Sequence, residues 1–194
     1  MDKLTRGDLY SLEQYAEVRS AFRAQVMEHK KNRRVPLGPI AALYFEDRLT
    51  MHYQIQEMLR AERIFEPQGV QEELDAYNPL IPDGSNWKAT FMIEYEDPEI
   101  RAAQLAKLIG IEDLVWVQVE GFDKVWCISN EDLERSTANK TSSVHFLHFR
   151  FSPEQIAAFR TAGTRVVLGF GHENYGHMVA LTPAQKEALA ADFD

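Results

Sequence analysis

Two spacings of apolar residues divide the chain into a helical first part and a strand-rich second part. From Leu12 to Met27 an apolar residue recurs at every third or fourth position, which is the period of one face of a helix. Ser11, with Gln14 three residues further on, has the pattern of a capping box that starts this helix. The elements expected up to about residue 78 are helices over residues 11–34, 48–65 and 68–77 and a short strand over 40–45.

Alternation of apolar and polar residues is typical of the second part, from about residue 86 to residue 194. Every second residue from Trp87 to Tyr95 is apolar, which is the period of a strand. Hairpins and strand–helix–strand units predict an α+β fold in one domain spanning 1–194, with a mixed or antiparallel sheet and packed helices. The expected strands cover residues 87–95, 115–119, 125–128, 143–151 and 165–170, and the expected helices cover 98–109, 131–135, 152–163 and the segment from 182.

Composition limits the partners and the compartment. The chain has 194 residues, a net charge of −9 and one cysteine, Cys127. A negative net charge opposes binding to nucleic acid and to anionic membranes, and no apolar run is long enough to cross a bilayer. One cysteine forms no internal disulfide, and the N-terminal residues lack the apolar core of a secretory signal. We therefore expect a cytoplasmic protein that binds neither nucleic acid nor a membrane.

His145 is the first candidate for chemistry. In the expected strand over 143–151, alternation places His145 on the same face as Leu147, Phe149 and Phe151. An imidazole among apolar side chains needs a partner, because an unpaired polar group is costly to bury. One interpretation is a core histidine that a neighbour satisfies; the other is a metal ligand or a proton-transfer group.

A glycine-rich loop near the C-terminus supplies further candidates. Gly169-Phe-Gly-His-Glu-Asn-Tyr-Gly-His leaves the end of an expected strand and contains His172, Tyr175 and His177. These side chains would bind a ligand, and the two histidines would bind a metal, if they share a site. The spacing of the histidines does not match the HExxH motif of zinc enzymes, so an exposed turn is the alternative interpretation.

Two carboxylates and one arginine complete the candidate set. Glu62 falls on the apolar stripe of the expected helix over 48–65, where burial would raise its pKa and suit it to proton transfer. Glu46 ends an apolar strand, a position that can point into a cleft. Arg60 is a candidate ligand-binding cation, or else an exposed charge that pairs with Glu57 along the helix. A divalent metal site would need several of the carboxylates and histidines to converge: Glu46, Glu62, His145, His172 and His177.

A short basic tract, His29-Lys-Lys-Asn-Arg-Arg, lies at the C-terminal end of the first expected helix. Cations at a helix C-terminus complement the helix dipole, which gives the tract a structural interpretation. The alternative is a docking patch for an acidic partner. Nucleophile and nucleotide motifs are absent, since the chain contains neither GxSxG nor a Walker A sequence.

Four segments of the chain resemble those of a known family: Phe45-Glu-Asp-Arg-Leu-Thr, Tyr53-Gln-Ile-Gln-Glu-Met-Leu-Arg, Glu72-Glu-Leu-Asp-Ala-Tyr-Asn-Pro-Leu-Ile-Pro and Ser143-Val-His-Phe-Leu. The family is bacterial, uncharacterised and catalogued as domain of unknown function 3501, and its members have about this length. Genes for such proteins often lie beside genes for rubrerythrin-like and iron–sulfur oxidoreductase proteins. The resemblance therefore implies a redox or oxidative-stress pathway, with redox proteins as partners, and it implies no catalytic residues.

Three hypotheses for the function follow. The leading one is a small-ligand-binding or metal-binding accessory protein, with a pocket lined by Glu46, Glu62, His145 and His172 where the two parts of the chain meet. The second is an enzyme in which His145 and Glu62 carry out general acid–base chemistry. The third is a protein-interaction module or homodimer that uses the apolar residues of helices 48–77 and the basic tract.

Overall fold

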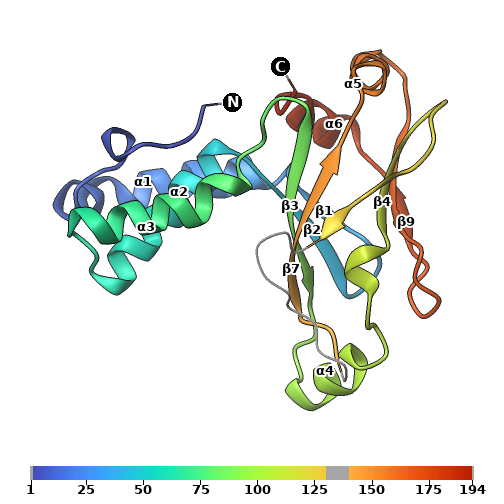
Figure 1. Cartoon of the computed structure of the whole chain (residues 1–194), viewed down its shortest axis with the longest axis horizontal. Helices are drawn as coiled ribbons and strands as arrows, with labels where there is room; N and C mark the ends of the chain where they lie inside the picture. Colours follow the sequence, from blue (N-terminus) through green and yellow to red (C-terminus); the bar gives the residue numbers. More distant parts are fainter. Residues whose placement is uncertain (1, 130–139, 194) are drawn as a thin grey trace.

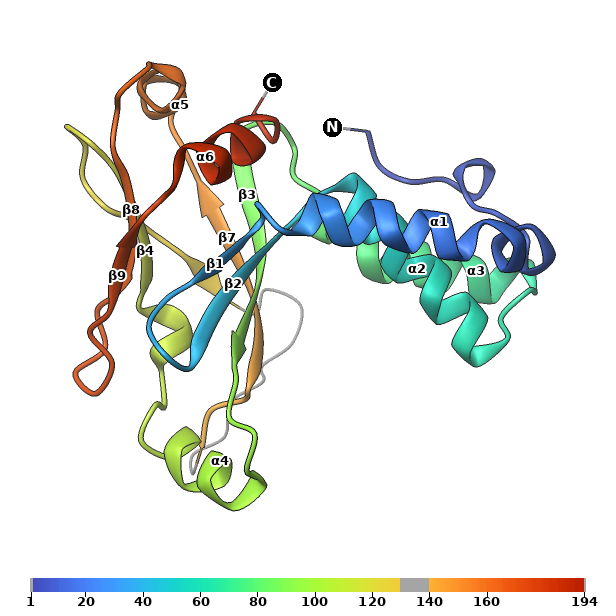
Figure 2. The ribbon, with the colours of Figure 1, turned by 180° about the vertical axis from the view of Figure 1, so that it is seen from behind.

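The helices of the first part lie to one side of the strands, whereas the strand expected at residues 40–45 pairs with a strand of the second part. The computed structural model describes residues 2–129 and 140–193. Three helices, α1 (Leu12–Lys30), α2 (Arg48–Glu62) and α3 (Pro67–Tyr77), lie together and extend to one side of a β-sheet region (Figures 1 and 2). We call these three helices the helical arm. The arrangement confirms an α+β fold with a helical N-terminal region.

Local sequence signals start the helices of the arm. The Ser11 hydroxyl accepts a hydrogen bond from the Gln14 amide, and the Gln14 side chain accepts one from the Ser11 amide, so the predicted capping box is present. Asp47 caps α2 in the same way, with Oδ1 accepting from the amide of Thr50 at 2.9 Å. The helices bury a small apolar cluster between them: Leu4, Met51, Ile55, Leu59, Leu74 and Ile81.

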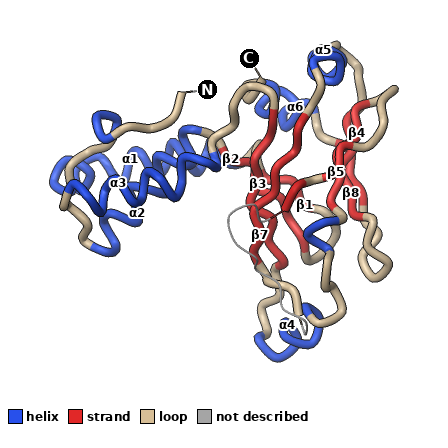
Figure 3. The backbone as a smooth tube through the Cα atoms, viewed as in Figure 1, coloured by secondary structure: helices blue, strands red, loops and turns tan. Residues whose placement is uncertain are grey.

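The strands form two sheets, and every strand pair in the described residues is antiparallel (Figure 3). The first sheet has the order β1 (Arg34–Pro36), β2 (Ala41–Glu46), β3 (Asn86–Ile93), β7 (Val144–Arg150) and β6 (Ile128–Ser129). The second sheet has the order β5 (Val125–Trp126), β4 (Val115–Val119), β8 (Val166–Phe170) and β9 (Met178–Ala180). Of the two sheet types expected from the sequence, the antiparallel one is therefore present.

One large core lies between the two sheets. Its central side chain is Trp87, which is fully buried and donates a hydrogen bond from Nε1 to the Leu189 carbonyl oxygen at 3.2 Å. Four phenylalanine rings surround this indole: Phe45, Phe151, Phe159 and Phe193. Helices α5 (Pro153–Arg160) and α6 (Pro183–Ala190) lie at one end of the sheets and α4 (Pro98–Leu105) lies at the other (Figure 1).

Several element boundaries differ from those expected. The hairpin of β4 and β5 is present, but the chain leaves it at Cys127 and then pairs with β7 in the first sheet, so the strand expected over 125–128 is divided. Strands β1 and β9 were not predicted, since each has only three residues and too little alternation to detect. The expected helical turn over 131–135 lies outside the described residues. Within residues 2–129 and 140–193, no helix has the length and apolar content of a membrane span.

Candidate functional site

A cavity of about 460 Å³ lies where the helical arm meets the first sheet. We call it the junction cavity. The first sheet uses one face for the large core, and its other face lines this cavity with Tyr44, Glu46, Thr90, Met92, Val144 and Phe146. The helical arm and the segment after it contribute Lys30, Met51, Gln54, Tyr77 and Leu80. The cavity therefore combines a mostly apolar wall with a few polar groups, as ligand sites commonly do.

Glu46 is the buried acidic group of the junction cavity. It ends β2 and is only 5% exposed. Its Oε1 accepts a hydrogen bond from Thr90 Oγ1 at 2.7 Å, whereas its Oε2 is buried and has no hydrogen-bond partner among the residues that the structure describes. A buried carboxylate oxygen without a donor is costly, so this atom is suited to accept a hydrogen bond from a ligand.

A cluster of buried charged side chains fixes the position of the backbone at Glu46. Arg33 is 2% exposed and donates from Nη2 to the Glu46 carbonyl oxygen at 3.1 Å and from Nε to the Phe45 carbonyl oxygen at 3.0 Å. The same guanidinium pairs with Asp192 at 2.5 Å, and its Nε lies 3.4 Å from Asp47 Oδ2. The cluster joins β2 to the C-terminal helix and fixes the end of the strand that carries Glu46.

Titration of Asp192 makes the contribution of this cluster to the free energy of unfolding depend on pH. Burial raises the pKa of Asp192 from its ordinary value of 3.8 to about 6, although the pairing with Arg33 acts in the opposite direction. Between those two values the folded chain binds the proton more tightly than the unfolded chain does, so this group's contribution to the free energy of unfolding falls as the pH rises from about 4 to about 6. The pKa of Asp47 is lowered despite its burial, because Arg33, Thr50 and His29 favour its charged form, so its own contribution is lost only in more acidic solution.

The Asp192→Asn variant is expected to lose this part of the pH dependence, because asparagine has no proton to titrate. Urea unfolding followed by circular dichroism, at several values between about pH 4.5 and about pH 7.5, compares the slopes of the variant and the native chain. Equal slopes in the two proteins would contradict the assignment.

His145 lies on the opposite face of the first sheet from the junction cavity. It is fully buried, its ring stacks on Phe91, and its Nε2 lies 2.9 Å from Thr141 Oγ1 and 3.0 Å from the Ser142 carbonyl oxygen. Thr141 in turn donates to Glu112 at 2.8 Å. This geometry supports the interpretation of a core histidine that its neighbours satisfy.

Cys127 lies next to Glu112, which belongs to the buried residues around His145. Its thiol donates to the Glu112 carbonyl oxygen at 2.9 Å, and burial raises its pKa to about 12. A thiol with so high a pKa is protonated at neutral pH and is a poor nucleophile. The interior between the sheets therefore contains a histidine, a carboxylate and a thiol that all serve packing and hydrogen bonding.

Most of the candidate side chains in the C-terminal loop make hydrogen bonds that stabilise the loop itself. His172 is 8% exposed; its Nδ1 accepts from the Asn174 amide at 3.1 Å, and its Nε2 lies 3.2 Å from the Ile109 carbonyl oxygen. The Tyr175 hydroxyl donates to the Leu37 carbonyl oxygen at 2.7 Å. His177 is exposed and its ring lies against that of Tyr175.

The structure does not bring the candidate residues together. Glu46 lines the junction cavity, His145 faces the core, and Arg60 and Glu62 are exposed at the end of α2. In residues 2–129 and 140–193, no three His, Cys, Asp or Glu side chains are grouped in a way that would hold a metal ion.

The sequence analysis expected a pocket at this junction with Glu46 in its wall, but it did not predict the other residues that line the cavity, although the sequence contains a signal for them. The second row of the expected strand over 143–151 holds Val144 and Phe146, and the polar row of the strand over 87–95 holds Met92 beside Thr90. Apolar residues in both rows of a strand indicate that both faces of the sheet are covered. A pocket on the second face therefore follows from these rows together with Glu46.

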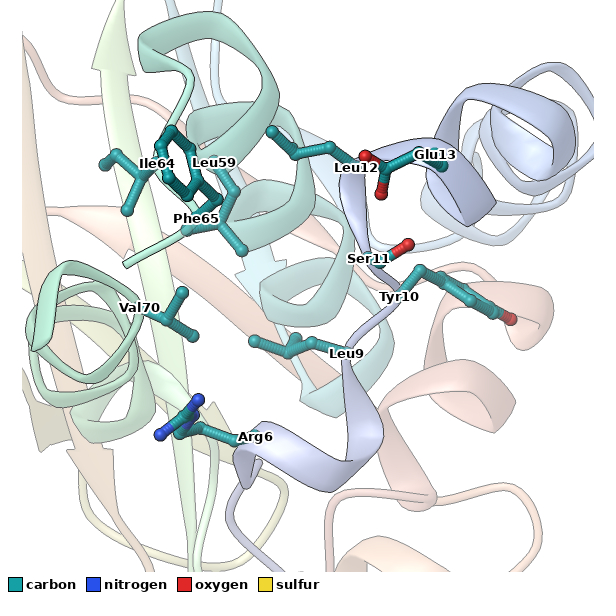
Figure 4. Close-up of a pocket in the computed structure, with 10 residues that line it drawn as sticks. All are labelled: Arg6, Leu9, Tyr10, Ser11, Leu12, Glu13, Leu59, Ile64, Phe65 and Val70. Carbon is teal, nitrogen blue, oxygen red and sulfur yellow. The ribbon is translucent and has the colours of Figure 1, made fainter. Parts of the chain in front are cut away.

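A second pocket, of about 490 Å³, lies in the helical arm at the end remote from the sheets. We call it the distal groove, and Figure 4 shows that Leu9 and Val70 approach each other across it. Its wall is mainly apolar and includes Leu12, Leu59, Ile64 and Phe65. The Phe65 ring at its edge is 72% exposed, which is unusual for a phenylalanine.

Comparison with known proteins identifies the family. The family described as "Protein of unknown function (DUF3501)" matches residues 3–193. The chain belongs to this family. The resemblance recognised in the four sequence segments is thereby confirmed.

A solved structure of a similar protein supports the DUF3501 fold. It is the crystal structure, at 1.90 Å resolution, of a novel protein of unknown function from Burkholderia pseudomallei K96243. The two chains are 47% identical, each is covered over 100% of its length, and the TM-score is 0.94. Among curated proteins, none matches the chain. The chain is therefore a DUF3501 protein, and neither the description of the family nor that of the solved structure names an activity.

Proposed function

We propose that this DUF3501 protein binds a small organic ligand in the junction cavity. The observation that carries the proposal is the Glu46 carboxylate, which is 5% exposed, lines a cavity of about 460 Å³ and has one oxygen without a hydrogen-bond partner in the described residues. That volume lies within the range of roughly 300–1,000 Å³ found for small-molecule sites. Binding rather than acid–base catalysis is favoured, because His145 and Glu62 do not line the cavity with Glu46.

The methionines of the chain provide a test of this proposal. Met51 and Met92 line the junction cavity, whereas Met178 is exposed on β9. With the methyl groups of methionine labelled with carbon-13, titration with benzyl alcohol as a neutral probe is expected to shift the Met51 and Met92 signals in a saturable way. The Met178 signal is expected to stay in place.

A cavity-filling variant and a matched control sharpen this test. Val144→Trp places an indole in the junction cavity and is expected to reduce probe binding by about tenfold or more, because the added ring occupies the space of the probe. Met178→Trp adds the same ring at a site that is 69% exposed and is expected to leave binding unchanged. If the probe shifts neither Met51 nor Met92, the proposed site is wrong.

We further propose that the protein acts as an accessory protein of a redox pathway in the cytoplasm. The support is the family resemblance, with its genes beside those of rubrerythrin-like and iron–sulfur oxidoreductase proteins, and the single, half-buried Cys127 with no disulfide partner. Purification of the chain together with the products of its neighbouring genes tests this proposal. Absence of complex formation with each of these proteins would count against it.

The distal groove favours a second candidate function, that of a protein-interaction module or homodimer. The exposed Phe65 ring beside an apolar groove has the character of an interface residue, since aromatic side chains are enriched in interfaces. Light scattering of the native chain and of Phe65→Ser distinguishes a homodimer built on this groove from a monomer. A mass equal to that of one chain in both samples would exclude the homodimer.

A further inference from the structure

We propose that the ligand of the junction cavity is a small organic amine, whose protonated amino group binds the Glu46 carboxylate and whose apolar body contacts Met51, Met92 and Phe146. This inference rests on the proposed function and adds the chemical class of the ligand. The inference states which chemical group the cavity binds, and all the residues on which it is based line that cavity.

The hydrogen bonding of Glu46 favours a donor over an acceptor. An ionised carboxylate has only acceptor positions, and Thr90 occupies Oε1, so Oε2 requires a group that donates. An ammonium group has three donors and no acceptor, and its hydrogen bond to a carboxylate is roughly twice as strong as one between neutral groups. A carboxylate ligand would place a second negative charge beside Glu46.

Among the residues that the structure describes, Glu46 has no counter-ion. Within the described residues, no basic side chain lies at ion-pair distance from its carboxylate. Arg33 donates to the backbone oxygen of Glu46, while its own charge is balanced by Asp47 and Asp192. A cation from solution would therefore gain a buried, uncompensated partner in Glu46.

Lys30 lies at the edge of the same cavity, and its positive charge disfavours a cationic ligand. It ends α1, is only half-buried and forms no ion pair in residues 2–129 and 140–193. Because the carboxylate is the more deeply buried of the two, the electrostatics of the interior are set by Glu46, and Lys30 weakens the binding of a cation. Removing each charge should thus change the affinity for an amine in opposite directions.

Three probes of one shape test the ligand class in the native chain: 3-phenylpropylamine, 3-phenylpropan-1-ol and 3-phenylpropanoate. They present a cation, a neutral hydroxyl and an anion on the same apolar body. Calorimetry at neutral pH is expected to show the amine binding at least about tenfold more tightly than the alcohol, and the anion binding most weakly. The methyl signals of Met51 and Met92 report whether each probe enters the junction cavity.

Two variants assign the preference to the named charges. Glu46→Gln keeps the side-chain shape and an acceptor for Thr90, and it is expected to weaken the amine about tenfold while changing the affinity for the alcohol less than about threefold. Lys30→Met is expected to strengthen the amine by roughly twofold to fivefold. If Glu46→Gln fails to fold, as judged by circular dichroism, the probe series and Lys30→Met decide the question.

Failure of the ligand class and failure of the site are distinguishable. An alcohol that binds as tightly as the amine and shifts Met51 and Met92 overturns the amine and leaves the cavity as a ligand site. An unchanged amine affinity in Glu46→Gln has the same meaning. If none of the three probes shifts either methionine, the proposed function itself is wrong.

Discussion

Replacing Arg33 with methionine is expected to destabilise the folded chain by about 3–5 kcal/mol. The side chain is 2% exposed and its guanidinium lies between the carboxylates of Asp47 and Asp192. Methionine has a similar length but no charge, so both buried carboxylates would lose their common cation. Breaking a buried ion pair by removing one partner costs much more than the pair itself contributes, because the remaining charge stays in the interior.

The hydrogen bonds of Arg33 add to this cost. Three backbone carbonyl oxygens, those of Phe45, Glu46 and Ala188, accept from the guanidinium at 3.0–3.1 Å. These groups lie at the end of β2 and at α6, so their loss is expected to weaken the attachment of the C-terminal helix to the first sheet. Urea unfolding followed by circular dichroism measures the change in free energy.

The neighbouring Arg34 is a matched control. It pairs with Glu94 at 3.0 Å, but the two side chains are 41% and 39% exposed. Arg34→Met is therefore expected to cost less than about 1 kcal/mol, as exposed ion pairs contribute little. Adding Asp192→Asn to Arg33→Met should recover part of the lost stability, because it removes one of the two stranded charges. A cost for Arg33→Met no larger than that for Arg34→Met would refute the importance of the buried cluster.

Replacing Trp87 with alanine is expected to cost about 3–5 kcal/mol as well, through a different mechanism. The indole is fully buried at the centre of the large core, where four phenylalanine rings contact it with centroids 4.7–5.3 Å away. Alanine leaves a cavity that the surrounding rings fill only in part, and the Leu189 carbonyl oxygen loses its donor. Thermal and urea unfolding measure this loss.

Trp126 is the control for Trp87. It lies on β5, is 46% exposed and has Lys124 near its ring. Trp126→Ala is expected to cost about 1 kcal/mol or less, because half-exposed side chains away from special features contribute little to stability. Equal costs at Trp87 and Trp126 would show that the core is not organised around the buried indole.

The sequence predicted those parts of the protein that depend on neighbouring residues. The capping box at Ser11 and Gln14, the strand that contains His145 and the hairpin of β4 and β5 all follow from signals within a few residues of one another. Even the burial of His145 was correctly inferred, because alternation assigns it to an apolar row. These signals determined the α+β class and the identity of most elements.

The candidate site required information that no local pattern contains. The sequence nominated Glu46 together with Glu62, His145 and His172, yet of these four only Glu46 lines the junction cavity. Alternation assigns a residue to a row of a strand, but it does not say which row faces the second sheet and which faces the helical arm. The sequence therefore could not show that His145 and Glu46 lie on opposite faces of the first sheet.

The sequence by itself determined most of the elements, the family and the acidic, single-cysteine character of the chain, because each depends on residue identity or on spacing along the chain. Only the tertiary structure decided which charged groups meet. The pairing of Arg33 with Asp192 joins residues that are 159 positions apart, and the contact of Glu46 with Thr90 joins residues 44 apart. The first contact follows from the packing of the C-terminal segment on the sheets, where burying apolar surface brings distant segments together, and the second follows from the pairing of β2 with β3. The same packing leaves one oxygen of Glu46 without a partner in the part of the chain that the structure describes, and that oxygen is the one we expect a ligand to bind.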